Sequence, residues 1–250
     1  MTRDAMGPVH EAERLTRPEA LEVLLKRPLA ILPIGATEQH GPHLPLGTDT
    51  FMAAEVARRL ASRTGGLLFP ALPVGYSWVW RDIPGTLVID EATLQQVIKD
   101  IVHNLHRQGV RTLVLVNGHG ANESALKYAV RELADETPMK VLYFSYFNHF
   151  GDSEKQVIDS PKWHGMVHAC EVETSLLLAV KPELCRMDRA VEEYPEVPPA
   201  YGVSALSLGS LSASGVFGDP TLATAEKGEK LIEAAVARIV EIIETVESAL

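Results

Sequence analysis

The segment Gly35-Ala36-Thr37-Glu38-Gln39-His40-Gly41-Pro42-His43-Leu44-Pro45-Leu46-Gly47-Thr48-Asp49 follows an apolar run, residues 29–34, that is typical of a buried strand. It concentrates carboxylate and imidazole side chains, which are ligands that zinc and similar divalent ions prefer. Residues two apart in an extended chain point the same way, so Glu38 and His40 could face one ion. The glycines and prolines turn the backbone and could return Asp49 beside them. The alternative interpretation of residues 35–49 is a polar surface loop without a metal. His43 is expected to support the site rather than to bind metal.

The composition favours one sizeable α/β domain spanning residues 1–250. The chain is 46% hydrophobic and 22% charged, and no low-complexity linker divides it. A net charge of −10 argues against nucleic acid and against an anionic membrane surface. No apolar run is long enough to span a bilayer. Two cysteines do not form a disulfide framework, and a reducing cytoplasm is the expected setting.

Apolar runs and amphipathic segments alternate along the chain. Strands are expected at 29–34, 67–74, 111–116 and 140–147, and helices at 16–26, 50–63, 90–108, 123–136, from 168 and from 219. Pro70 and Pro73 weaken the second strand. Residues 1–15 are expected to be loosely ordered, and 148–167 to form a long loop. The alternation predicts a three-layer α/β/α sandwich around a mostly parallel sheet.

A parallel sheet would bring candidate ligands together. Right-handed crossovers place the turns after residues 34, 74 and 116 at one edge of the sheet, where ligand sites of such folds lie. Glu38, His40 and Asp49 can therefore meet His119, which follows the third strand. Two imidazoles and two carboxylates suit a pair of ions, and the short Asp49 side chain is the natural bridge between them.

His168 and Glu173 are candidates for proton transfer because both lie where an apolar helix enters the core. A capping or core histidine is the alternative for His168. Both residues can act only if His168 precedes the first helical turn. Glu173 adjoins an apolar stretch, where a carboxylate needs a partner or a metal, so it is favoured over Glu171 as the inner residue.

Trp78, Trp163 and Asn122 are the expected substrate-binding residues, with Trp80 as another aromatic candidate. Loop tryptophans can instead pack on the core. The glycines around His119 match neither a P-loop nor a dinucleotide fingerprint, so a nicotinamide enzyme is disfavoured.

Four motifs resemble the creatininase (creatinine amidohydrolase) family. They are Gly-Ala-Thr-Glu-Gln-His-Gly-Pro-His-Leu-Pro-Leu-Gly-Thr-Asp at 35–49, Asn-Gly-His-Gly-Ala-Asn at 117–122, His-Ala-Cys-Glu-Val-Glu-Thr-Ser at 168–175 and Gly-Val-Phe-Gly-Asp-Pro at 215–220. The resemblance implies a homo-oligomer, a hexamer in the family, that binds two divalent ions, zinc with manganese, iron or a second zinc. It also implies cleavage of C–N amide bonds.

The resemblance implies roles for individual residues. Glu38, His40, Asp49 and His119 look like ligands, with Asp49 bridging. His168 looks like the histidine that handles substrate and protons, and Glu173 like the acidic residue beside it. Creatininase has a further glutamate where this chain has Ala121, and Glu173, Glu171 or Glu123 could replace it.

The expected function is hydrolysis of a C–N amide bond by metal-activated water. The substrate could be a cyclic amide, a formamide or a small peptide-like molecule, since the family also resembles a mycofactocin-precursor peptidase and a formamidopyrimidine deformylase. The alternatives are a metal-dependent isomerase or lactonase acting on a polyol or ketose, and a metal-binding oligomer without activity.

Overall fold

A five-stranded parallel sheet forms the centre of the computed structural model, which describes residues 7–248. The strand order is β1 (His10–Glu11), β3 (Leu67–Leu68), β2 (Leu29–Ile34), β4 (Thr112–Asn117) and β5 (Lys140–Ser145). β2 pairs with β4 along its whole length, from Leu29 opposite Thr112 to Ile34 opposite Asn117. Both strands are completely buried, as expected for the middle of a parallel sheet.

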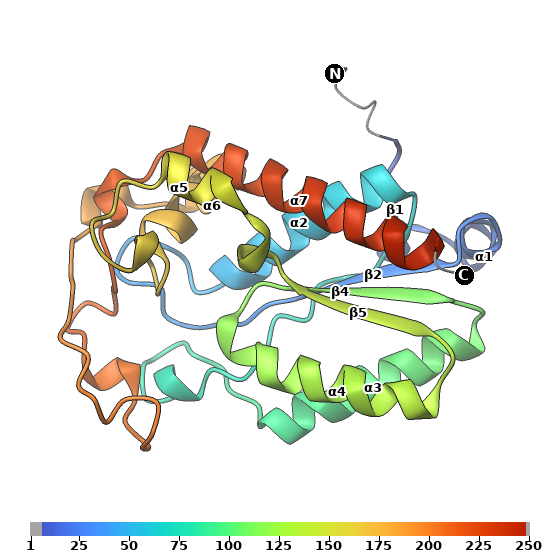
Figure 1. Cartoon of the computed structure of the whole chain (residues 1–250), viewed down its shortest axis with the longest axis horizontal. Coiled ribbons are helices and arrows are strands. Elements are labelled where there is room, and N and C mark those ends of the chain that lie inside the picture. Colours follow the sequence, from blue (N-terminus) through green and yellow to red (C-terminus); the bar gives the residue numbers. More distant parts are fainter. Residues whose placement is uncertain (1–6, 249–250) are drawn as a thin grey trace.

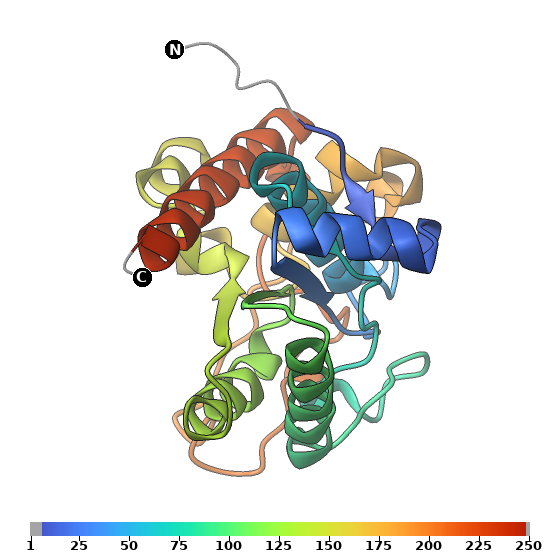
Figure 2. The same cartoon turned by 90° about the vertical axis from the view of Figure 1, so that its right-hand side faces the viewer.

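Helices cover both faces of the sheet (Figures 1 and 2). The helices are α1 (Arg17–Lys26), α2 (Thr48–Thr64), α3 (Glu91–Arg107), α4 (Glu123–Glu136), α5 (Asp152–Val157), α6 (Glu171–Val180) and α7 (Ala225–Ser248). The predicted three-layer α/β/α sandwich is therefore confirmed. Among residues 7–248, no helix is both long and apolar enough to cross a membrane.

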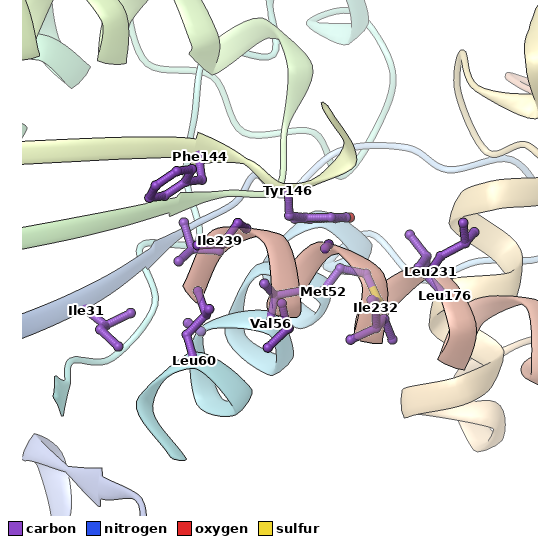
Figure 3. Packing of buried hydrophobic residues seen from close by; sticks show 14 of the residues in the cluster. Ile31, Met52, Val56, Leu60, Phe144, Tyr146, Leu176, Leu231, Ile232 and Ile239 are labelled. Atoms are coloured by element: carbon purple, nitrogen blue, oxygen red, sulfur yellow. The ribbon is translucent and has the colours of Figure 1, made fainter. Parts of the chain in front are cut away.

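Each face of the sheet has its own hydrophobic core. Leu29 and Ile31 of β2 point into the core shared with α2, α6 and α7, part of which Figure 3 shows. Ala30, Leu32 and Ile34 point into the core beneath α3 and α4. This alternation follows from the two-residue period of a strand, and it makes the apolar run 29–34 suitable only for a strand buried on both sides.

Several element boundaries differ from the sequence-based expectations. β3 ends at Leu68, because the prolines at 70 and 73 cannot donate hydrogen bonds to a neighbouring strand. Residues 10–14 are not loosely ordered, since His10 and Glu11 add β1 to the sheet edge; residues 1–6 lie outside the described range. The expected loop 148–167 contains α5, and the last helix begins at Ala225 rather than at 219.

The chain leaves β2 and β4 toward opposite faces of the sheet. The segment after β2 leads to α2 on one face, and the segment after β4 leads to α4 on the other. These strands are neighbours, so a crevice opens between their carboxyl ends, which is the usual ligand site of such sheets. The long connections 148–167 and 181–222 gather beyond these ends, on the left of Figure 1.

Two glycines allow α2 to begin close to both strand ends. A Cβ atom on Gly35 would lie 2.4 Å from the Thr50 Cα, and a Cβ atom on Gly118 would lie 2.2 Å from the Asp49 carbonyl oxygen. Both contacts are with backbone atoms, so a side chain at either position would push the first turn of α2 away. The glycines therefore keep Asp49 beside the residues that follow β4.

We expect Gly118→Ala to destabilise the protein by about 1–3 kcal/mol, because the added methyl overlaps backbone that cannot rotate away. Gly120→Ala is the matched control, since a Cβ there meets nothing within 4 Å. Urea unfolding of both variants provides the measurement. Equal midpoints for the two variants would contradict this account of Gly118.

Candidate metal centre

Glu38, His40, Asp49 and His119 meet at the crevice between β2 and β4. Glu38 and His40 lie on the segment after β2, Asp49 in the first turn of α2, and His119 directly after β4. All four side chains are buried. His40 Nε2 lies 3.0 Å from Asp49 Oδ1, and His119 Nδ1 lies 3.0 Å from Asp49 Oδ2. The structure thus brings together residues that are up to 81 positions apart in the chain.

Asp49 belongs to two separate groups of possible ligand atoms. One group is Glu38, Asp49 and His119; the other is His40, Asp49 and Glu173. Within each group the ligand atoms lie within 4.8 Å of one another. Each Asp49 oxygen faces a different histidine, which is the arrangement that a carboxylate shared between two ions requires.

Hydrogen bonds orient both histidines of these groups. His40 Nδ1 donates to the Glu38 carbonyl oxygen at 3.1 Å, which leaves Nε2 for the Asp49 side. His119 Nε2 donates to the Tyr76 carbonyl oxygen at 3.1 Å, which leaves Nδ1 for the other Asp49 oxygen. Metal-binding histidines in proteins usually donate their second ring N–H in this way.

Unpaired buried oxygens also fit a cation. Glu38 Oε2 accepts no hydrogen bond from the residues that the structure describes, and Asp49 Oδ2 faces His119 Nδ1 without hydrogen-bond geometry. Leaving such oxygens buried and unpaired is costly. A positive ion between them would satisfy both, so the donor set fits divalent metals.

The cluster carries strongly shifted pKa values. Burial lowers the pKa of His40, but the Asp49 carboxylate outweighs burial and raises it to about 10. His119 follows the same pattern, with Glu38 and Asp49 raising its pKa to about 9 against burial. Burial opposes ionisation of Asp49, but His40 and His119 hold its pKa below the usual range. Without metal, the carboxylates and imidazoles thus pair with one another.

His168 lies immediately before α6, as its predicted role requires. Its Nε2 donates to the Gln39 carbonyl oxygen at 2.7 Å, and its Nδ1 lies 3.7 Å from Glu38 Oε1. The ring stacks against Trp80 and His40, each with centroids 4.4 Å apart. Burial and the nearby His40 keep the pKa of His168 well below its ordinary value, so the ring is neutral with an acceptor nitrogen at Nδ1.

Glu173 reaches the cluster from inside the first turns of α6. Its carboxylate accepts the backbone N–H of Ala169, whose φ of 48° is uncommon for a residue other than glycine. Burial raises the pKa of Glu173 to about 7, although His40 opposes the shift. The turn at Ala169 allows His168 and Glu173 to line the same cavity.

Of the three glutamates that could replace the one missing at Ala121, only Glu173 joins a ligand group. Glu171 is fully buried but points elsewhere, where it accepts hydrogen bonds from the backbone of Asp159 and Ser160 and from Lys227. Glu123 accepts weak hydrogen bonds from Ser145, at 3.2 Å, and from Asn148, at 3.4 Å.

A cavity of about 400 Å³ opens onto the cluster. Its wall consists of Glu38, Asp49, Val79, Trp80, Gly118, His119, Gly120, Ala121, Tyr146, Phe147, Asn148, Met166, Val167, His168, Val172, Glu173, Leu176, Tyr201 and Leu208. This volume is in the range of small-molecule sites. The expected pocket loops 75–86 and 148–167 both contribute.

The structure does not place the predicted substrate-binding residues on this wall. Trp78 packs under the Arg81 guanidinium, and Trp163 lies against Tyr194 with ring centroids 5.4 Å apart. Asn122 is fully buried and uses its amide to hold the Tyr76 N–H and the Gly35 carbonyl oxygen. In an irregular loop, sequence spacing does not reveal which tryptophan faces inward, and Trp80 occupies the wall instead.

The cavity wall also contains two tyrosines that the sequence did not single out, and His43 lies outside the ligand groups. Tyr146 and Tyr201 line the cavity, and the only available signal for Tyr146 was its position at the carboxyl end of the last strand. His43 Nε2 lies 2.9 Å from Thr174 Oγ1 and joins none of the ligand groups, so it supports the loop.

Comparisons with known proteins all indicate similarity to creatininase and its relatives. The family model for creatininase, described as creatinine amidohydrolase, matches residues 13–243. A creatinine amidohydrolase from Pseudomonas putida is 35% identical, with 85% of this chain and 87% of that protein covered. A mycofactocin precursor peptide peptidase from Mycobacterium ulcerans is also 35% identical, with coverages of 82% and 80%. A 3-dehydro-scyllo-inosose hydrolase from Thermotoga maritima is 28% identical, with coverages of 89% and 78%.

Solved structures extend this similarity to the fold. A crystal structure of creatinine amidohydrolase superimposes with a TM-score of 0.84 at 31% identity, covering 96% of this chain and 98% of the other. Two other creatininase structures, both with a TM-score of 0.83, are described as a Zn-Zn type and as a manganese form. This chain therefore belongs to the creatininase (creatinine amidohydrolase) family of metal-dependent amidohydrolases.

Proposed function

We propose that the protein hydrolyses a C–N amide bond with two divalent ions held in its crevice. Glu38, Asp49 and His119 hold one ion, and His40, Asp49 and Glu173 hold the other. The observation that carries this proposal is the position of Asp49, whose two oxygens face different histidines in two ligand groups. Zinc and manganese are the expected ions, because creatininase structures are described with each.

When bound, the ions supply an activated water and polarise the amide carbonyl. The side chains of this protein then have distinct tasks. His168 is neutral, its tautomer is set by the hydrogen bond from Nε2 to Gln39, and its free Nδ1 takes up the proton that the water loses. The same nitrogen gives that proton to the leaving amine. Glu38, 3.7 Å from Nδ1, stabilises the imidazolium between these transfers.

A second candidate is hydrolysis of a cyclic polyol ketone, which the similarity to 3-dehydro-scyllo-inosose hydrolase favours. The same ions can polarise a ketone as well as an amide. A substrate panel containing creatinine, formamides, short peptides, lactones and cyclic polyol ketones separates the possibilities. Turnover of the C–N substrates alone supports the proposed amidohydrolase activity. Turnover of the lactones or cyclic polyol ketones alone would contradict it and would favour the second candidate.

The cellular location and the oligomeric state of the protein stay predictions. The first is a cytoplasmic location, and the second is assembly into a homo-oligomer. Size-exclusion chromatography with light scattering tests the second.

Asp49→Ala should remove both ions, since Asp49 serves both ligand groups, whereas His40→Ala should remove chiefly one. His103→Ala is the control, because His103 lies on α3, away from the cluster, and pairs with the exposed Glu136 of α4. Elemental analysis after dialysis gives the metal content per chain. An Asp49→Ala protein with the metal content of the wild type would contradict the assignment.

Metal binding should release at least about two protons per chain at pH 7.5, because His40 and His119, with pKa values raised to about 10 and 9, must lose their protons to bind an ion, and burial also raises the pKa values of the Glu38 and Glu173 carboxyls. Lowering the pH therefore weakens binding. Calorimetry in buffers of different ionisation enthalpy counts the protons. Metal binding that releases no protons would contradict this description of the metal-free cluster.

His168→Gln should lower kcat by about 10²–10⁴-fold, because it removes the group that moves the proton. Its metal content should stay close to the wild-type level, since His168 is absent from the two ligand groups that share Asp49, although it forms a third possible group with Glu38 and His40. His106→Gln on α3 is the control. Unchanged turnover in the His168→Gln protein would assign the proton transfer to another residue.

A further inference from the structure

The cavity has a polar inner end and an apolar mouth. The proposed ligands and His168 form the inner end, where side chains are almost completely buried. The more exposed part of the wall, here called the mouth, consists mainly of apolar or aromatic side chains, namely Val79, Phe147, Met166, Val167, Tyr201 and Leu208, together with Gly120, Ala121 and one polar side chain, Asn148. Val167 alone is 41% exposed. Partly exposed apolar side chains that converge on a pocket indicate that an apolar part of a ligand covers them.

The described wall of the cavity contains no lysine or arginine. Its acidic and histidine side chains are Glu38, Asp49, Glu173, His119 and His168, and all of them lie at the inner end, among the proposed ligands or beside them. Three cations nearby in the chain are engaged elsewhere. Arg81 lies over Trp78, Lys162 lies over Tyr194, and Lys227 binds Asp159 and Glu171. An anionic group at the mouth would therefore lose water without gaining a counter-charge.

One side of the wall consists of small residues. Gly118, Gly120 and Ala121 contribute no long side chain where the segment after β4 passes the cluster. Ala121 adds neither charge nor bulk to this wall. The space beside the ions is consequently open toward the apolar mouth.

We infer that the substrate is an amide that carries an uncharged, apolar group next to the scissile bond, and that amides with a carboxylate or phosphate at that position are rejected. This inference rests on the proposed function, because the ions fix the amide at the inner end. An apolar group then displaces water from the mouth, whereas an anion there would be buried unpaired.

Hydroxamic acids test this ranking without turnover, because they chelate zinc and carry different tails. Acetohydroxamic acid has no tail, octanohydroxamic acid has an apolar tail, and the monohydroxamate of adipic acid has an anionic one. On the zinc-loaded protein, calorimetry should show octanohydroxamic acid binding at least about tenfold tighter than acetohydroxamic acid. The adipic monohydroxamate should bind no tighter than acetohydroxamic acid. If the adipic monohydroxamate binds as tightly as octanohydroxamic acid, or more tightly, the inference is overturned.

Variants at the mouth should invert this preference. Leu208→Lys and Val167→Lys each add a cation beside the tail, so either should tighten the adipic probe and weaken the octanoic one. Val203→Lys is the control, since Val203 is 84% exposed and does not line the cavity. Unchanged ranking in both folded mouth variants would count against the inference.

The metal-stripped protein separates the two proposals. If acetohydroxamic acid binds equally with and without zinc, the proposed metal centre fails. If acetohydroxamic acid binds only with zinc, but the acid with the anionic tail binds more tightly than the acid with the apolar tail, the metal centre stands and the inference about the substrate fails.

Discussion

The buried carboxylate of Asp49 is the constraint on which the rest of the site depends. It is 3% exposed, and an isolated charge at that depth would be too costly to keep ionised. His40 and His119 pair with its two oxygens, and the first turn of α2 favours a negative charge there. Because each oxygen faces a different histidine, the same carboxylate can serve two ions.

The fold supplies this geometry through two adjacent strands that send the chain to opposite faces. Asp49 arrives on α2 from one side, and His119 follows β4 on the other. Because Gly35 and Gly118 carry no side chain, the first turn of α2 packs directly against both strand ends. The site thus rests on rigid strand ends and a helix start, which position side chains more firmly than long loops do.

The two carboxylates in the first turn of α6 point to different partners. Residues 171 and 173 are two positions apart on a helix, so their side chains point in nearly opposite directions. Glu173 turns inward to His40 and Asp49, whereas Glu171 turns outward to Lys227 of α7 and to the backbone at 159 and 160. That second contact ties the connection 148–167, which forms part of the cavity wall, to two helices.

The sequence by itself determined the layers of the fold and the four clustered side chains Glu38, His40, Asp49 and His119. Hydrophobic periodicity identifies buried parallel strands, and parallel topology brings the residues after them to one edge. The sequence favours Glu173 over Glu171, and the tertiary structure shows that Glu173 points into the cluster and that Trp80 lines the cavity. Those placements depend on the turn at Ala169 and on the path of an irregular loop, and neither has a periodicity that a sequence can reveal.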